Sequence, residues 1–306
     1  MNITLLLHLI LLLIFPPLLL GFIGKTKAFF AGRQGAPLLQ PYYDLFKLMH
    51  KASVYSVTTN WIFRAAPMVS LAAILSAGIL MPIASFKPPI QFWGDIILFV
   101  YLLALARFVI ILAALDTGSS FEGMGASREA TFGCLSEITM FLNLTILALL
   151  SGKLSLSEIF LGGLSSSWLQ VGPVLILVVV SFFLILLVEN SRIPVDDPET
   201  HLELTMIHEV MVLDHSGVDL AYILYGKAVK LFLFGTMLIS IIITFKPRDF
   251  LIDTAFFIFE IIGFAILIGV IESTMARLRL NKVSFLLFSA FIFSIFGFIV
   301  ILVRGH

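Results

Sequence analysis

Eight long apolar runs dominate this sequence of 306 residues. Each is close to the roughly 20 helical residues that cross the hydrocarbon core of a bilayer. In lipid, backbone hydrogen bonds must close within each segment, and this favours helices. The sequence therefore predicts an all-α integral membrane protein, a bundle of about eight transmembrane helices in a single membrane domain over residues 1–306. The expected spans are approximately 3–23, 63–84, 92–114, 130–150, 171–189, 219–244, 252–272 and 284–303.

The composition excludes several kinds of function. Hydrophobic residues make up 60% of the chain and the formal net charge is zero, so no basic face is expected for nucleic acid. The single cysteine, Cys134, can form no internal disulfide and cannot by itself hold a cysteine-ligated zinc or iron–sulfur centre. We therefore expect no metal or cofactor on this chain, and any redox centre must belong to a partner.

The connections between the runs predict an orientation. Loops 24–62, 115–129, 190–218 and 273–283 fall on one face. Eleven of the nineteen Lys and Arg residues lie there or at its border, against five in the opposite loops and terminus. This excess predicts that the face is cytoplasmic and that both termini lie outside. The first run lacks a basic n-region and a small-residue cleavage site, so we expect it to be retained as the first helix.

The segment QPYYDLFKLMHK, residues 40–51, predicts an in-plane amphipathic helix opened by Pro41. Apolar residues recur at i, i+3, i+4 and i+7: Tyr42, Leu45, Phe46 and Met49. Polar residues fall largely elsewhere: Asp44, Lys47, His50 and Lys51. Such a helix could be a strut on the membrane surface, or it could frame the mouth of a cavity.

The connection 188–217 gathers titratable groups. It holds seven carboxylates, three histidines and one arginine, although the whole chain has only nineteen acidic residues. Asp197-Pro198 is typical of a helix start and Ser216-Gly217 of a helix stop, so we expect a helix between them. Glu199 and Glu203 would share one face of it. Asp196 lies just ahead, and mutual repulsion would favour a proton on at least one of these carboxylates.

Three histidines recur in this connection at intervals of seven, His201, His208 and His215. Along a helix they would lie about 10 Å apart, which is too far for two of them to share one metal ion. A solvated cytoplasmic face and a proton relay through water remain open, with a metal site the least favoured. Arg192, which follows Glu189, is expected to pair with a carboxylate of the loop.

Ionisable side chains also occur well inside the expected spans, namely Arg107, Glu137 and Glu260. Such groups are costly in a bilayer unless they face a polar path or one another. Each alone could be a polar clamp between helices. Three together favour a hydrated route across part of the membrane.

Three segments resemble one family. GRQGAPLLQPYYDLFKL is similar to its first cytoplasmic loop, and LALARFVIILAALDTGSSFEGMGASREA is similar to its third span and second cytoplasmic loop. ENSRIPVDDPETHLEL resembles its Glu-x-x-Arg-x-Pro-Phe-Asp signature. The family is subunit 1 of respiratory complex I. The motif sequences are most similar to those of the membrane subunit of group 4 NiFe hydrogenases, formate hydrogenlyase and hydrogenase-4-like complexes. The resemblance covers nearly the whole chain.

The resemblance implies roles for particular residues. It implies a proton or ion path through carboxylates and their neighbours: Glu129, Glu137, Glu189, Arg192, Asp196, Glu199 and Glu203. It implies a cavity or partner interface that includes Arg33, Asp44, Lys47, Asp116, Arg128 and Asp214. Val195 replaces the signature phenylalanine where complex I shapes its quinone cavity, so this departure argues against quinone binding without excluding it.

The family also implies function and partners. We expect a non-redox membrane-anchor and coupling subunit of an oxidoreductase in the cell inner membrane. Its partners would be iron–sulfur proteins and hydrogenase-large-subunit-like proteins, with or without Ni-Fe, on the cytoplasmic face, antiporter-like membrane subunits, and lipid. The alternatives are the quinone-site subunit of an NADH:quinone oxidoreductase, a stand-alone ion-coupled secondary transporter, and a purely structural anchor.

Overall fold

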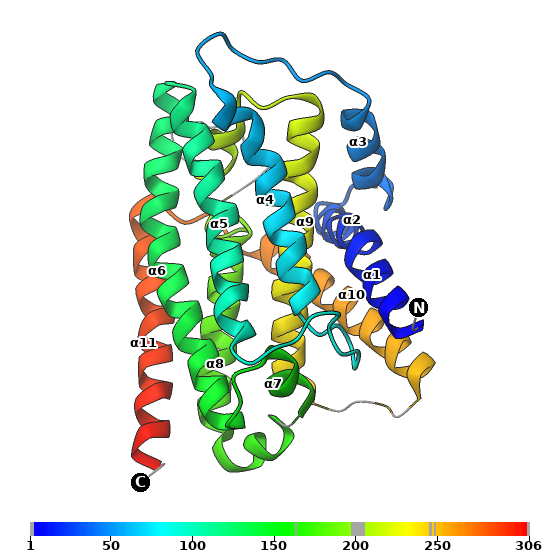
Figure 1. Cartoon of the computed structure of the whole chain (residues 1–306), viewed down its shortest axis with the longest axis vertical. Coiled ribbons are helices and arrows are strands. Elements are labelled where there is room, and N and C mark those ends of the chain that lie inside the picture. The colour runs from blue at the N-terminus through cyan, green and yellow to red at the C-terminus, as the bar shows by residue number, and fades with distance from the viewer. Residues whose placement is uncertain (1–2, 163, 197–205, 245–246, 248, 305–306) are drawn as a thin grey trace.

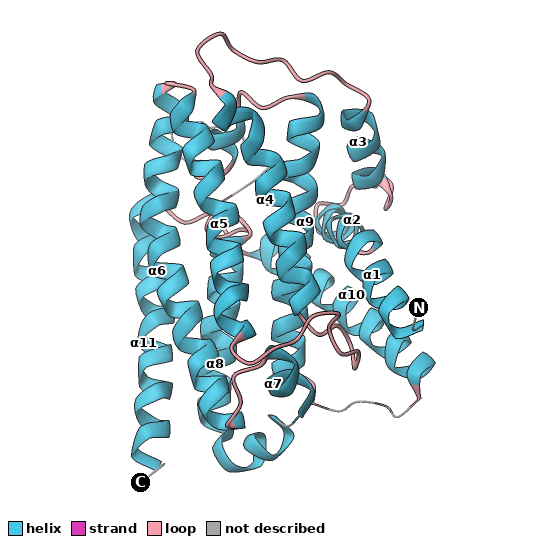
Figure 2. Ribbon diagram, viewed as in Figure 1, coloured by secondary structure: helices cyan, strands magenta, loops and turns pink. Residues whose placement is uncertain are grey.

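The structure is a computed structural model, and it describes the chain apart from residues 1–2, 163, 197–205, 245–246, 248 and 305–306. Helices account for most of the described residues, and Figure 2 draws no strand among them. The helices are α1 Ile3–Ile14, α2 Pro16–Phe30, α3 Gln40–Met49, α4 Trp61–Leu80, α5 Asp95–Asp116, α6 Ser120–Ser151, α7 Leu156–Gly162, α8 Leu164–Glu189, α9 Gly217–Ile242, α10 Phe250–Thr274 and α11 Leu280–Arg304.

Seven of the described helices are long and apolar enough to cross a membrane, namely α4, α5, α6, α8, α9, α10 and α11. The bent pair α1 and α2 would make an eighth. In Figure 1, α4, α5, α6, α8, α9 and α11 stand nearly upright, while α1, α2 and α10 lie to one side. The predicted all-α membrane bundle is confirmed.

The first predicted span is not one straight helix. It breaks at Phe15, and the two halves are bent by 46°. Pro16 and Pro17 follow the break, and proline lacks the backbone N–H that would continue the helix of the preceding turn. The run predicted for residues 3–23 therefore forms α1 and part of α2, and α2 continues to Phe30.

The predicted loop 115–129 is mostly helical. Gly118 takes a left-handed conformation at φ 70°, and α6 begins two residues later at Ser120. Glu122 and Glu129 lie on the buried side of this extension. This polar segment is therefore helical with both carboxylates facing the protein interior.

The connection after α8 also differs from expectation. We predicted a helix between Asp197 and Ser216, but residues 206–216 contain only the short 3-10 helix η1, Glu209–Val212. Its side chains pack inward, with Val210, Met211 and Val212 all buried. His208 and His215 therefore do not lie along one helical face.

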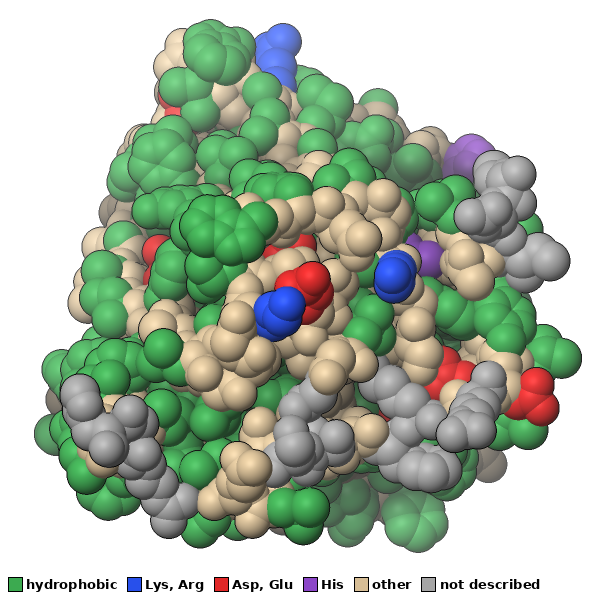
Figure 3. Space-filling model, turned by 60° about the horizontal axis from the view of Figure 1, so that its bottom comes forward, with side chains coloured by type: hydrophobic (Ala, Val, Ile, Leu, Met, Phe, Trp, Pro, Cys, Tyr) green, Lys and Arg blue, Asp and Glu red, His purple; other side chains and the backbone are tan. Residues whose placement is uncertain are grey.

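The amphipathic helix is confirmed as α3, with Pro41 in its first turn. Tyr43, Phe46 and Met49 are exposed, so the helix presents an apolar surface outward. The Tyr42 hydroxyl donates to the carbonyl oxygen of Ile14 at the break between α1 and α2. Figure 3 turns forward the end of the bundle that lies at the bottom of Figure 1, where α7 is found. Charged side chains are few on this face.

A fully buried polar group joins α6, α8 and α11. The Asn143 amide donates to Ser181 Oγ at 3.0 Å, and Ser294 Oγ donates to Asn143 Oδ1 at 2.8 Å. The Ser181 and Ser294 hydroxyls are 2.7 Å apart. Without hydrogen bonds these buried groups would be costly, so together they hold α11 against its neighbours.

Replacing Asn143 with Leu should weaken the docking of α11, because both serines lose a partner. We expect a loss of about 1 kcal/mol in the free energy of unfolding, measured by SDS titration of the purified protein. Ser289→Ala is the control, since the Ser289 hydroxyl bonds only within its own helix, to Leu286 O. Equal stability of the two variants would contradict this role.

Candidate functional site

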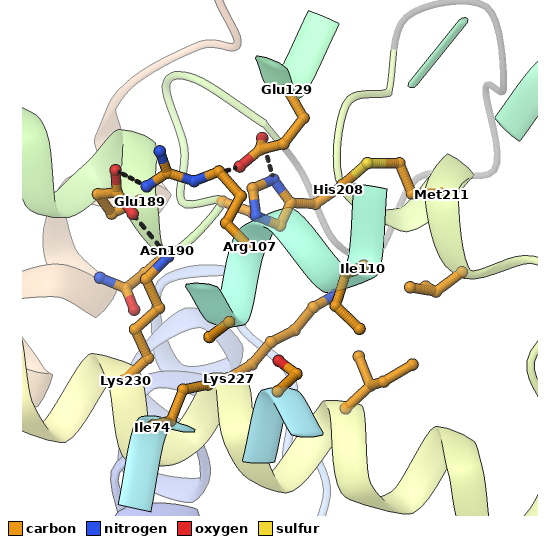
Figure 4. A pocket seen from close by; sticks show the side chains of 15 residues that line it. Ile74, Arg107, Ile110, Glu129, Glu189, Asn190, His208, Met211, Lys227 and Lys230 are labelled. Atoms are coloured by element: carbon orange, nitrogen blue, oxygen red, sulfur yellow. Dashed lines mark hydrogen bonds and ion pairs between the residues drawn. The ribbon is translucent and has the colours of Figure 1, made fainter. Parts of the chain in front are cut away.

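A cluster of charges lies inside the bundle between α5, α6, α8 and α9. Its centre is Arg107 of α5, which is 9% exposed. Arg107 Nη1 donates to Glu137 Oε1 at 2.6 Å, and its Nε lies 3.1 Å from Glu129 Oε1. Its Nη2 donates to Glu189 Oε1. Figure 4 shows the guanidinium between Glu129 and Glu189.

A second cation completes the inner part of the cluster. Lys230 Nζ of α9 lies 2.6 Å from Glu189 Oε2, and the Ser136 hydroxyl donates to Glu189 Oε1. The three carboxylates therefore meet two basic side chains, Arg107 and Lys230. One further positive charge, or one proton on a carboxylate, would make the cluster neutral.

The cluster continues into the connection after α8 through His208. His208 Nδ1 lies 3.0 Å from Glu129 Oε2. A cavity of about 60 Å³ adjoins Arg107, Glu129, Glu189 and His208, with the remaining wall made mostly of α4, α9 and the connection. That volume has room for a few water molecules. Polar groups and water in contact are what a short proton path requires.

Local sequence on α6 explains how Arg107 fits. Glu129, Gly133, Ser136 and Glu137 recur at helical spacing and face the same region. A side-chain carbon at Gly133 would lie only 2.5 Å from Arg107 Nη1 and 2.8 Å from its Cδ. The absence of a side chain at Gly133 therefore makes the space that the guanidinium occupies.

Asp196 holds the backbone of the connection next to this cluster. Its Oδ2 accepts the backbone N–H groups of Ile207 at 3.0 Å and His208 at 3.1 Å. Its Oδ1 accepts from Arg277 Nη2 at 2.9 Å. These bonds fix the position of the His208 backbone, and so help to place the imidazole beside Glu129.

Arg192 contacts a carboxylate outside its own loop. Arg192 Nη1 lies 3.3 Å from Glu272 Oε1 on α10. The predicted pairing with a loop carboxylate stays a prediction, because Asp197, Glu199 and Glu203 lie outside the described residues. Lys27 of α2 is 3.5 Å from the other oxygen of Glu272. Arg192 therefore ties the connection to α10 and α2 by a second, separate group of charges.

Comparisons with known proteins give the family. The family described as NADH dehydrogenase matches residues 2–303. The chain belongs to this family, whose members include subunit 1 of NADH dehydrogenase. The resemblance of the sequence to this family is confirmed, and the chain is a multi-pass membrane protein.

Among relatives of this NADH dehydrogenase family member are two from Escherichia coli K12. Formate hydrogenlyase subunit 4 is 29% identical over 94% of both chains. Hydrogenase-4 component C is 30% identical over 92% of this chain and 90% of the relative. An NADH-quinone oxidoreductase subunit of Bordetella petrii is 29% identical over 70% of this chain and 60% of its own length.

A solved structure shares the fold. It is a chain in the structure of the membrane-bound sulfane sulfur reductase, an archaeal respiratory membrane complex. The TM-score is 0.83 at 20% identity, over 97% of this chain and 98% of that one. At this identity the likeness establishes the fold of this family member and not its chemistry.

The other predicted site residues lie in several places. Asp116 accepts from Asn60 N and Nδ2 at 2.7 and 2.8 Å. Arg128 donates to the carbonyl oxygen of Met206 at 2.9 Å, and the Asp214 N–H donates to Glu122. Arg33, Asp44 and Lys47 are exposed on and beside α3. Glu199, His201 and Glu203 lie outside the described residues.

Three members of the cluster, Lys230, Ser136 and Gly133, were not among the predicted site residues. Lys230 lies within an expected span, so the criterion that selected Arg107 and Glu137 could have found it. Gly133 could not have been found in this way, because it has no side chain and its role is to leave space for Arg107. Glu260, selected by the same criterion, lines a small space of about 20 Å³ with Asp253, away from Arg107.

The expected relay histidines are in different surroundings. His215 is 4% exposed, and its ring stacks on Phe63 with centroids 4.0 Å apart. Burial lowers the pKa of His215 to about 4, against the opposing effects of Asp219 and Asp214. For Glu209, burial would raise the pKa, but Lys227 Nζ at 2.6 Å outweighs it and lowers the pKa.

His215 should make stability depend on pH. Its pKa is lower in the folded protein than the usual value near 6.5, so the unfolded chain binds more protons between about pH 4 and 6.5. Stability attributable to this group is therefore greatest above pH 6.5 and falls by up to about 3 kcal/mol as the pH drops to 4. Thermal unfolding of His215→Phe should lack this part of the decline. An unchanged pH profile would contradict the assignment.

Proposed function

We propose that this chain is the membrane-anchor and coupling subunit of a complex I-like or energy-converting hydrogenase-like oxidoreductase. It would link electron transfer in docked iron–sulfur subunits to translocation of protons or sodium ions through buried carboxylates. Its role in the enzyme is then non-redox, with the redox centres on the partners. The observation that carries the proposal is the Arg107 cluster, which joins the membrane interior to the connection after α8.

The charge inventory of the cluster supports a role in moving protons. Among the described residues, Glu129, Glu137 and Glu189 pair with two strongly basic side chains, Arg107 and Lys230. An unbalanced charge is costly inside a membrane protein, so this arrangement would attract one additional proton into the cluster. A small change in the local potential can then decide where that proton resides.

Two members of the cluster, His208 and Glu137, lie toward different sides of it. On one side, His208 belongs to the connection that we predict to be cytoplasmic, where an iron–sulfur partner would dock. A unit charge about 10 Å away contributes roughly 2 kcal/mol at an effective dielectric constant of about 20, enough to shift a proton equilibrium about tenfold.

On the other side, the Glu137 side chain is 31% exposed. It borders an open groove between α5 and α6 that also includes Tyr101, Phe108 and Cys134. A carboxylate facing lipid would be costly. We propose that an antiporter-like membrane subunit covers this groove and receives the proton.

The cavity size favours water over a quinone. At about 60 Å³ it is far smaller than the roughly 300 Å³ or more of typical small-molecule sites. Its polar wall consists of paired charges that also suit water. A quinone-site subunit and a stand-alone transporter remain the competing functions. Inhibition by quinone-site ligands would favour the first, and ion transport by the isolated chain would favour the second.

Replacing Glu137 with Gln tests the path. The amide oxygen can still accept from Arg107, so the complex should assemble and retain its electron-transfer activity. The cluster loses its excess negative charge, so ion pumping should fall at least about tenfold. Pumping is measured as the pH gradient formed by inverted membrane vesicles, normalised to electron transfer. Glu158→Gln is the control, because Glu158 is exposed and pairs only with Lys153. Unchanged pumping in Glu137→Gln would remove this residue from the path.

A pair of glycine variants on α6 tests the position of Arg107. Gly133→Ala places a carbon against the guanidinium and should displace it, lowering pumping at unchanged subunit content. Gly123→Ala should have little effect, since a side-chain carbon at Gly123 meets nothing within 4 Å. The same vesicle assay applies, and equal pumping by the two variants would show that the exact position of Arg107 is unimportant.

A further inference from the structure

A groove with no role in the Arg107 cluster lies between α2, the segment 31–37 and the start of α3. Its volume is about 440 Å³. Three cations line it, Lys25, Lys27 and Arg33, and no Asp or Glu is found among its described lining residues. The groove is therefore a positively charged recess beside an amphipathic helix.

Hydrogen bonds to backbone carbonyl oxygens fix the segments that carry Lys25 and Arg33, and such bonds do not neutralise the positive charge of the groove. Lys25 Nζ donates to the carbonyl oxygen of Gln34 at 2.9 Å, which ties α2 to the segment carrying Arg33. The Arg33 N–H donates to the carbonyl oxygen of Ala28, so this segment folds back on the end of α2. Lys27 forms an ion pair with Glu272, whereas the side chains of Lys25 and Arg33 are exposed.

Small residues shape the recess. A side-chain carbon at Gly21 would collide with the carbonyl oxygen of Leu38, and one at Gly35, where φ is 64°, would collide with Ala28 Cβ. These close approaches bring the start of α3 down onto α2. Gly24 also lines the groove, and a carbon there would meet nothing within 4 Å. The volume above Gly24 is thus open to a ligand.

The surroundings of the recess are apolar and exposed. Phe29 is 80% exposed, Phe30 51%, Leu39 47% and Phe46 68%. An amphiphile with an anionic head and hydrocarbon chains would satisfy both parts at once: its head would meet the cations, and its chains would cover the aromatic surface. A free anion would use only the cations.

We propose that this groove binds the headgroup of an anionic phospholipid, with its phosphate between Lys25 and Arg33 and its acyl chains along α2 and α3. The proposal is independent of the function proposed above, since it involves no member of the Arg107 cluster. It accounts for the charged recess between α2 and α3 and for the exposed aromatic residues Phe29, Phe30 and Phe46 beside it.

The test uses the intact complex purified in mild detergent, stripped of lipid and then mixed with phosphatidylglycerol, phosphatidylcholine or glycerol phosphate. Native mass spectrometry counts the bound molecules. We expect retained phosphatidylglycerol to exceed phosphatidylcholine, and to fall about tenfold in Lys25→Gln/Arg33→Gln. Gly24→Leu should also reduce it by filling the recess without removing charge. Arg279→Gln/Lys282→Gln is the matched control, removing one exposed Arg and one exposed Lys elsewhere.

Several outcomes would overturn the proposal. Unchanged retention in both groove variants would place the lipid elsewhere, and an equal loss in the control would show only a general charge effect. Equal binding of phosphatidylcholine would mean that the anionic head is not recognised, and equal binding of glycerol phosphate would assign a free anion site. Cross-linking of Gly24→Cys to a protein partner would assign the groove to that partner. Gly24→Leu, which keeps all charges, decides the matter if the double variant does not assemble.

Discussion

The buried guanidinium of Arg107 is the group on which the interior of this bundle depends. A permanent positive charge inside a membrane protein must be paired, because its desolvation is otherwise prohibitive. Here carboxylates of α6 and α8 converge on it from different sides, and Lys230 of α9 balances Glu189 in turn. Four helices are therefore held at the distances that these contacts require, and Gly133 leaves the space that the guanidinium fills.

The same pairing rule extends the cluster out of the helices. Glu129 uses its second oxygen for His208, and Asp196 holds the backbone of His208 while it pairs with Arg277. An irregular connection thus has a defined position relative to the membrane interior. A partner that pushes on this connection, or changes the potential near it, would act directly on the Glu129–His208 contact. This is the physical basis for the proposal that the connection responds to a docked partner.

Not every buried carboxylate in the bundle has such a role. Asp95 accepts the Ser155 hydroxyl at 2.8 Å and the Leu156 N–H at 2.7 Å, and so holds the start of α7. Asp253 accepts both the hydroxyl and the N–H of Ser85. These two aspartates bind neutral donors: Asp95 caps α7, and Asp253 fixes the loop that carries Ser85. The glutamates around Arg107 instead share cations. The type of partner, more than burial itself, separates these two groups of carboxylates.

The sequence by itself determined the membrane bundle, the amphipathic helix α3 and the family. The length of the apolar runs, the helical periodicity and the motif sequences are all local properties of the chain. It also pointed to Arg107 and Glu137 individually, since charges inside apolar runs are rare. Only the tertiary structure decided their partners. The pairing of Arg192 with Glu272, the use of Asp196 as a backbone anchor and the need for Gly133 depend on segments far apart in the chain. The expected helix after Asp197 gave way, over residues 206–216, to an irregular connection because buried packing and bonds to Asp196 outweigh local helical signals.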